Sequence, residues 1–130
     1  MIESTEKRAA SPRGFTLVEI MIVVALIGLL ASIAVPTFVR ARSTSQQNAC
    51  INNLREIFGA TQQWALEYHE APNAPVAFTD IQFYLKNAIV CPAGGSSATF
   101  ANSYTLTDVT NVPTCKIVPS AHILAPDTTQ

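Results

Sequence analysis

The stretch RGFTLVEIMIVVALIGLLASIAVPTFV, residues 13–39, decides the fold of this 130-residue chain. Between residues 15 and 39 the only ionisable side chain is that of Glu19. A helix over these residues would be about 37 Å long at about 1.5 Å per residue, whereas the hydrocarbon core of a bilayer is about 30 Å thick. The sequence therefore predicts a membrane-spanning helix over residues 15–39.

The carboxylate of Glu19 is unusual in such a helix, because an unpaired charge in lipid costs several kcal/mol. One interpretation is a residue near a helix end that reaches back to the lipid headgroups and is stabilised by the positive end of the helix dipole. The other is a functional residue whose charge meets a partner. Taken alone, the residues leave both interpretations open.

The sequence GFTLVE at residues 14–19, followed by the apolar helix, resembles the class III signal of type IV prepilins and type II secretion pseudopilins. In that family a prepilin peptidase cuts after the glycine and methylates the new terminal amine. The resemblance implies that Gly14 and Phe15 flank the processed bond. It also implies that Glu19 is the filament-assembly carboxylate and that Pro36 marks a helix kink. The resemblance is specific up to Pro36 and extends to the fold alone beyond residue 70.

A physical reason supports the assembly role of Glu19 that the resemblance implies. In a filament, helices pack side by side in a medium of low dielectric constant. A terminal amine of one subunit and a carboxylate of its neighbour would each be costly there alone, and each compensates the other when paired. The implied partners are the prepilin peptidase, copies of the chain, other pilin-like subunits, an inner-membrane assembly platform and the lipid bilayer.

Residues 1–14 form a polar leader that lacks the apolar core of an ordinary secretory signal peptide. Cleavage after Gly14 would leave the hydrophobic helix on the mature chain as an anchor. Basic residues occur on both sides of the span, so their count does not set its orientation. The resemblance implies a single pass through the inner membrane, with a cytoplasmic leader and a head in the periplasm or in a filament.

Residues 40–70 are predicted to continue the helix in amphipathic form, and the part up to Asn48 is expected to be weak because it lacks large apolar side chains. Pro72 and Pro75 are expected to end the helix near Glu70. One face carries apolar side chains at three- and four-residue steps, which predicts a stripe that packs on a core. Its members are Cys50, Ile51, Leu54, Ile57, Phe58, Thr61, Trp64, Ala65 and Tyr68.

Residues 71–130 contain six of the eight prolines and few charges, which predicts a small head. A capping box starting at Thr79 predicts a short helix over residues 80–87. The residues after Cys91 predict a turn, and the runs 103–109 and 115–118 predict an antiparallel hairpin. The predicted fold is α+β and pilin-like, with one long N-terminal helix packed on a small C-terminal antiparallel sheet.

Three cysteines allow one disulfide and leave one thiol. Cys91 and Cys115 flank the predicted turn and hairpin, whereas Cys50 lies in the helical stripe, so we favour a pair of Cys91 with Cys115. That bond would contribute about 3 to 4 kcal/mol in the chain-entropy picture and would require an oxidising compartment. The alternative is three reduced, buried cysteines.

The sequence offers no catalytic set, because it has no G-x-S-x-G elbow, no P-loop, no CxxC pair and no HExxH motif. His69 lies at a predicted helix end and His122 alone in the tail, so neither indicates a metal ligand. The few carboxylates of the head are too few for calcium, which takes six to eight oxygens. We therefore expect no enzyme, no cofactor and no metal, and the net charge of −1 does not suggest a nucleic-acid partner.

The function that the resemblance implies is that of a structural subunit of a pseudopilus or pilus. The small head favours a pseudopilin that serves type II protein secretion. A type IV pilus subunit is the first alternative. The second is a membrane-anchored binding module that does not assemble and displays its head outside the cytoplasm.

Overall fold

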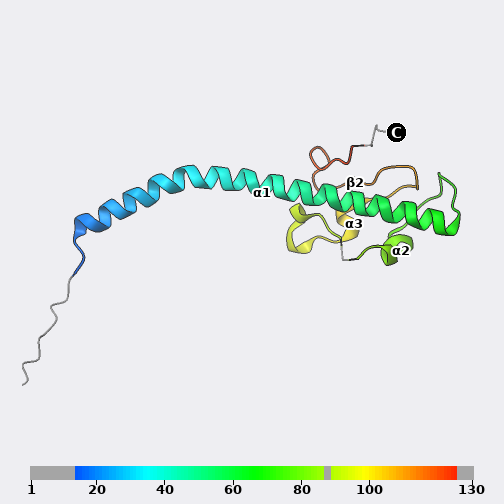
Figure 1. The fold of residues 1–130 in the computed structure, drawn as a ribbon, viewed down its shortest axis with the longest axis horizontal. Coiled ribbons are helices and arrows are strands. Elements are labelled where there is room, and N and C mark those ends of the chain that lie inside the picture. Colours follow the sequence, from blue (N-terminus) through cyan, green and yellow to red (C-terminus); the bar gives the residue numbers. More distant parts are fainter. Residues whose placement is uncertain (1–13, 87–88, 126–130) are drawn as a thin grey trace, which may run out of the picture. The chain divides into compact units, whose positions relative to one another are not determined.

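A computed structural model describes residues 14–86 and 89–125 of the chain. Nearly all of the predicted leader lies outside the described residues, of which Gly14 is the first. The chain divides into two compact units, Met1–Phe38 and Val39–Gln130, and the helix α1 runs from the first into the second. Figure 1 shows the order of the elements along the chain.

Helix α1, Leu17–Tyr68, confirms the long helix that the sequence predicts. The backbone N–H of Glu19 donates to Oγ1 of Thr16 over 3.2 Å, so Thr16 caps the first turn. At the other end, His69 has a φ of 55° and the N–H of Glu70 donates to the carbonyl of Ala65 over 2.9 Å. This left-handed residue and the bond after it form a Schellman cap, which ends the helix.

The second half of α1 packs on the head through the predicted stripe. Residues 40–48, predicted to be weak, are helical throughout, and Gln47 Nε2 donates to the carbonyl of Ala121 over 2.8 Å. Tyr68 is the member that the prediction places wrongly, because its side chain is 62% exposed. The buried residues of α1 are Cys50, Leu54, Ile57, Ala60, Thr61 and Ala65.

The head begins with two short helical segments, α2 at Phe78–Ile81 and η1 at Gln82–Tyr84. The predicted start at Thr79 is wrong, because Ala77 is the N-cap and its N–H donates to Asp80 Oδ2 over 2.9 Å. Asp80, which the prediction makes the first residue of the helix, is therefore its third residue and caps its start. The predicted end at residue 87 lies outside the described residues.

After Cys91 the predicted turn is the 3₁₀ helix η2, Pro92–Ser97, and the sequence analysis missed α3, Phe100–Ser103. Thr99 caps α3, since its Oγ1 accepts from the N–H of Asn102 and its own N–H donates to Asn102 Oδ1 over 2.7 Å. An Asn takes the place that Glu or Gln occupies in the usual capping box, so the pattern was not recognised.

The predicted hairpin is present and antiparallel but much shorter than expected. Strand β1, Tyr104–Thr105, pairs with β2, Thr114–Cys115, with Tyr104 opposite Cys115. Beyond β1 the backbone bonds to another segment, because Thr107 and Val109 pair with Val76 and Ala74 over 3.2 Å. The residues that would have extended β1 therefore hold residues 74–76 instead.

The core of the head forms where α1, α2 and the sheet meet, in agreement with the predicted α+β fold. Tyr104 is its largest fully buried side chain, and its hydroxyl accepts a hydrogen bond from Asn53 Nδ2 over 3.0 Å. In Figure 1 the green half of α1 lies beside α2 and α3. The other buried apolar residues outside α1 are Val76, Ile81, Ile89, Cys91, Val109 and Cys115.

Candidate functional site

The first candidate site is the N-terminal end of α1. Phe15 is 80% exposed and precedes the helix, and Glu19 lies in the first helical turn with its side chain exposed. Thr16 and Glu19 stand at the positions of a capping box, a spacing that the sequence itself shows. A carboxylate in a first turn also interacts favourably with the helix dipole.

The apolar surface of α1 extends from this end on all sides of the helix. Every residue from 14 to 45 is exposed in the single chain, and the helix is long and apolar enough to cross a membrane. Exposed side chains on this segment include Ile20, Leu26 and Phe38, at 50%, 56% and 67%. Such a continuous apolar surface requires lipid or other apolar helices to cover it.

Two residues inside this segment permit close approach or bending. Gly28 has open space where a Cβ would stand, so a neighbouring backbone could approach it. Pro36 lies inside α1 and does not end it. Because proline has no backbone N–H, the helical bond to the carbonyl four residues earlier, that of Ser32, is not made. The kink at Pro36 stays a prediction.

The second candidate site is a buried cluster of three cysteines in the head. Cys50 comes from α1, Cys91 precedes η2 and Cys115 belongs to β2, with exposures of 0%, 0% and 2%. The Sγ atoms of Cys91 and Cys115 are 3.7 Å apart, and all three cysteines are free thiols. A disulfide bond measures about 2.05 Å, so the fold brings the predicted pair together and the bond itself stays a prediction.

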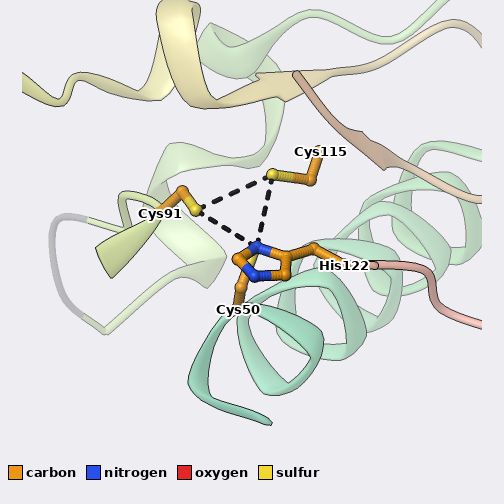
Figure 2. A group of neighbouring side chains, drawn as sticks. All are labelled: Cys50, Cys91, Cys115 and His122. Carbon is orange, nitrogen blue, oxygen red and sulfur yellow. Dashed lines mark hydrogen bonds between the residues drawn. The ribbon is translucent and has the colours of Figure 1, made fainter. Parts of the chain in front are cut away.

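His122 joins these cysteines, so the prediction that places it alone in the tail is wrong. Its Nδ1 lies 3.5 Å from Cys91 Sγ and 3.8 Å from Cys115 Sγ, and the residue is 5% exposed. Figure 2 shows the imidazole and the three thiols converging from four segments of the chain. The available signal in the sequence is the short interval of six residues between Cys115 and His122.

Burial governs the protonation of this cluster. It raises the pKa of Cys50 to about 12, raises that of Cys91 and lowers that of His122. For Cys115 burial is again the largest influence and raises the pKa, but hydrogen bonds from the backbone of Val118 and Ile117 oppose it and the net pKa is lowered. Burial therefore favours the neutral forms of Cys50, Cys91 and His122, whereas the surroundings of Cys115 favour its thiolate.

The N-terminal segment matches a family model, and one relative extends the match over most of its own length. The model is described as the prokaryotic N-terminal methylation motif and covers residues 10–35. The chain is 35% identical over 83 residues to the competence protein ComGC of Bacillus subtilis. This match covers 63% of this chain and 83% of ComGC. The chain belongs to the family of type IV pilins and type II secretion pseudopilins.

Other members of the pilin and pseudopilin family are similar over less than half of this chain. The type IV major pilin PilA of Myxococcus xanthus is 46% identical over 55 residues, 42% of this chain and 25% of PilA. The type II secretion system core protein G of Escherichia coli is 33% identical over 60 residues, 46% of this chain and 41% of that protein. The chain thus spans less than half of these two relatives, and no solved structure matches it.

The family model covers the N-terminal segment in which the sequence analysis places the processing and assembly residues. The motif matched by the family model contains Gly14, Phe15 and Glu19, the residues that the resemblance singled out. These two relatives are named as a type IV major pilin and as a core protein of a type II secretion system. The cluster of Cys50, Cys91, Cys115 and His122 lies outside the matched motif and needs an explanation of its own.

Proposed function

We propose that this chain is a structural subunit of a pseudopilus or pilus filament that assembles through residues 15–39. The observation that carries this proposal is the fully exposed apolar surface of that segment with a single carboxylate, Glu19, in its first turn. Lipid would cover the surface before assembly, and the same segments of neighbouring subunits would cover it afterwards. The function is mechanical, and the relatives give no reason to propose catalysis.

Cleavage of the leader creates the proposed partner of the Glu19 carboxylate, the amine of Phe15. The prepilin peptidase cuts between Gly14 and Phe15 and methylates the amine of Phe15, which leaves a positive charge at the new N-terminus. The amine of one subunit then meets the Glu19 carboxylate of its neighbour inside the packed helices. The pair favours one axial register, because any other register would leave both charges unpaired in an apolar medium.

The proposed topology follows from the same arrangement. Residues 1–14 are a cytoplasmic leader, residues 15–39 cross the inner membrane, residues 40–70 continue the helix, and residues 71–130 form the head outside the cytoplasm. Pro36 bends the helix near its exit from the membrane. The subunit would pass from the bilayer into the filament at an inner-membrane assembly platform.

Between the two filaments, we favour the pseudopilus of type II secretion, because the head of this chain is small. The pilus is the second candidate, and the 46% identity to the Myxococcus xanthus pilin favours it, although that match covers 42% of this chain and 25% of the pilin. A deletion strain distinguishes them. Loss of a secreted enzyme from the medium with surface filaments intact supports the pseudopilus, and the reverse supports the pilus.

The assembly proposal is tested with Glu19→Ala and a matched control, Glu56→Ala, which removes another exposed carboxylate of α1. Filaments are collected from cells by shearing and centrifugation and quantified by immunoblot, with the membrane fraction as reference. We expect Glu19→Ala to accumulate as processed chain in the membrane without filaments and Glu56→Ala to assemble normally. Normal filaments from Glu19→Ala would overturn the role of Glu19, and the absence of filaments from the unaltered chain would support the anchored binding module.

A further inference from the structure

We propose that Cys50, Cys91, Cys115 and His122 form a tetrahedral binding site for a divalent metal ion, with Zn²⁺ as its preferred occupant. Each residue offers one ligand atom, and the four atoms lie within 4.8 Å of one another. Three thiolates and one imidazole are a common ligand set of structural zinc sites. The site is independent of filament assembly and replaces the disulfide that the sequence predicted.

The distances fit a single metal ion at the centre of the cluster. With Zn–S bonds of about 2.3 Å and Zn–N bonds of about 2.0 Å, tetrahedral geometry places two sulfurs about 3.8 Å apart and a sulfur and a nitrogen about 3.5 Å apart. The Sγ atoms of Cys91 and Cys115 are 3.7 Å apart, and His122 Nδ1 lies 3.5 Å and 3.8 Å from them. Small side-chain rotations would complete the geometry at Cys50.

The groups around the cluster are arranged to support thiolates. Asn53 donates to the hydroxyl oxygen of Tyr104 over 3.0 Å, so the Tyr104 proton is available for Cys50 Sγ, 3.7 Å away. Hydrogen bonds of this kind orient the ligands of a metal site and stabilise their charge.

Binding of Zn²⁺ would exchange protons for the metal. The three thiols lose three protons to solvent, the neutral imidazole loses none, and the bound site carries a net charge of −1. No electron is transferred, so the site needs no oxidant. A disulfide between Cys91 and Cys115 would instead remove two electrons and two protons and would destroy two of the four ligands.

The site would hold together the parts of a head that has little apolar core. Its ligands come from α1, from the start of η2, from β2 and from the turn that follows β2. A metal ion at their centre fixes these segments at one point, which is how structural zinc stabilises small domains. All four ligands are 5% exposed or less, which suits a structural site without an open position for substrate.

The direct test is metal and thiol analysis of the unaltered full-length chain, purified in detergent without a polyhistidine tag. We expect about one Zn²⁺ per chain by elemental mass spectrometry and three titratable thiols after denaturation. The intact mass of the protein should equal that of the fully reduced chain. Replacement by Co²⁺ should give the visible absorption of a tetrahedral site with sulfur charge-transfer bands. One thiol with a mass lower by two hydrogens, or three thiols without metal, would overturn the proposal.

Substitutions of His122 test whether the bound metal is held by this cluster. His122→Ala should lower the zinc content and abolish the tetrahedral Co²⁺ spectrum, whereas His122→Cys should restore both with four sulfur ligands. The matched control is His69→Asn, which removes the other histidine and keeps a residue that tolerates its φ of 55°. Equal zinc contents for His122→Ala and His69→Asn, with circular dichroism showing that both fold, would contradict the site.

Discussion

The backbone N–H of Glu19 donates to Oγ1 of Thr16 over 3.2 Å, which places the conspicuous carboxylate of this chain at the third position of its long helix. In a capping box the Glu at this position reaches back to the N–H of the N-cap residue, so Glu19 could serve two purposes, as a helix-capping side chain and as a charge for a neighbouring subunit. The two purposes make different demands, because capping accepts Glu or Gln whereas an ion pair requires Glu.

Glu19→Gln separates these purposes. Gln retains an oxygen that can accept from the backbone at the helix start but carries no charge. We expect Glu19→Gln to fail in filament assembly as completely as Glu19→Ala, while its membrane level and processing stay normal. Filament yield from sheared cells measures this. Rescue of assembly by Gln would show that Glu19 acts through the cap and would contradict the ion pair.

Leu54→Ala tests whether the second half of α1 carries the core of the head. Leu54 is fully buried, and removal of such a side chain costs about 2 to 5 kcal/mol through lost burial and a residual cavity. Leu66→Ala is the control, because Leu66 lies on the same helix and is 78% exposed. Denaturant unfolding of the full chain in detergent should show a large loss for the first variant and a small one for the second.

Tyr104→Phe tests the buried hydroxyl at the centre of the head. Its loss leaves the half-buried Asn53 side chain with the Val90 carbonyl but without the Tyr104 hydroxyl as a partner, and we expect a cost of about 1 kcal/mol. Tyr84→Phe is a matched change at a hydroxyl whose bond to Glu67 is exposed, so its effect should be smaller. If the two variants unfold at the same denaturant concentration, burial does not govern the value of these bonds.

Asp108 gives a prediction of pH dependence. The backbone N–H and side-chain amide of Asn111, with the N–H of Thr110, bond to its carboxylate and lower its pKa below the usual 3.8. A pKa lowered by folding stabilises the fold above the unfolded pKa, and this stabilisation is lost as the pH falls through the folded pKa.

Asp108→Asn should therefore be less stable than the unaltered chain at pH 7, and the difference should shrink as the pH falls below about 4. Melting temperatures of both proteins across that range measure it. Because the carboxylate is at the surface, a small effect is expected. A difference that stays constant down to the lowest pH would mean that the charge of Asp108 has no part in it.

The long helix could be predicted to within two residues at each end, because apolar periodicity and the prolines after Glu70 are local signals. The strands were predicted too long, because nothing local shows that Val109 bonds to Ala74 rather than extending the hairpin. The resemblance singled out the N-terminal motif that the family model later matched. The arrangement of the segments in the head therefore depends on contacts between residues far apart in the sequence, which local patterns do not reveal.

The cluster of cysteines shows the same limit at a site. The residue types and the three thiols were visible in the sequence, and the nearness of Cys91 to Cys115 could be inferred from the predicted hairpin. The positions of Cys50 and His122 beside that pair could not be inferred from the sequence. The four residues span positions 50 to 122 and lack the short spacing of known zinc motifs. Only the fold brings one residue from each segment to a common point.

The intact mass of the chain extracted from cells tests the central claim most directly, namely that processing converts an anchored precursor into a filament subunit. With an active prepilin peptidase, we predict a chain that begins at N-methylated Phe15, after loss of the first 14 of its 130 residues. In a strain without the peptidase, the same chain should keep residues 1–14 and form no filaments. Chain that keeps residues 1–14 in cells with an active peptidase would contradict the account.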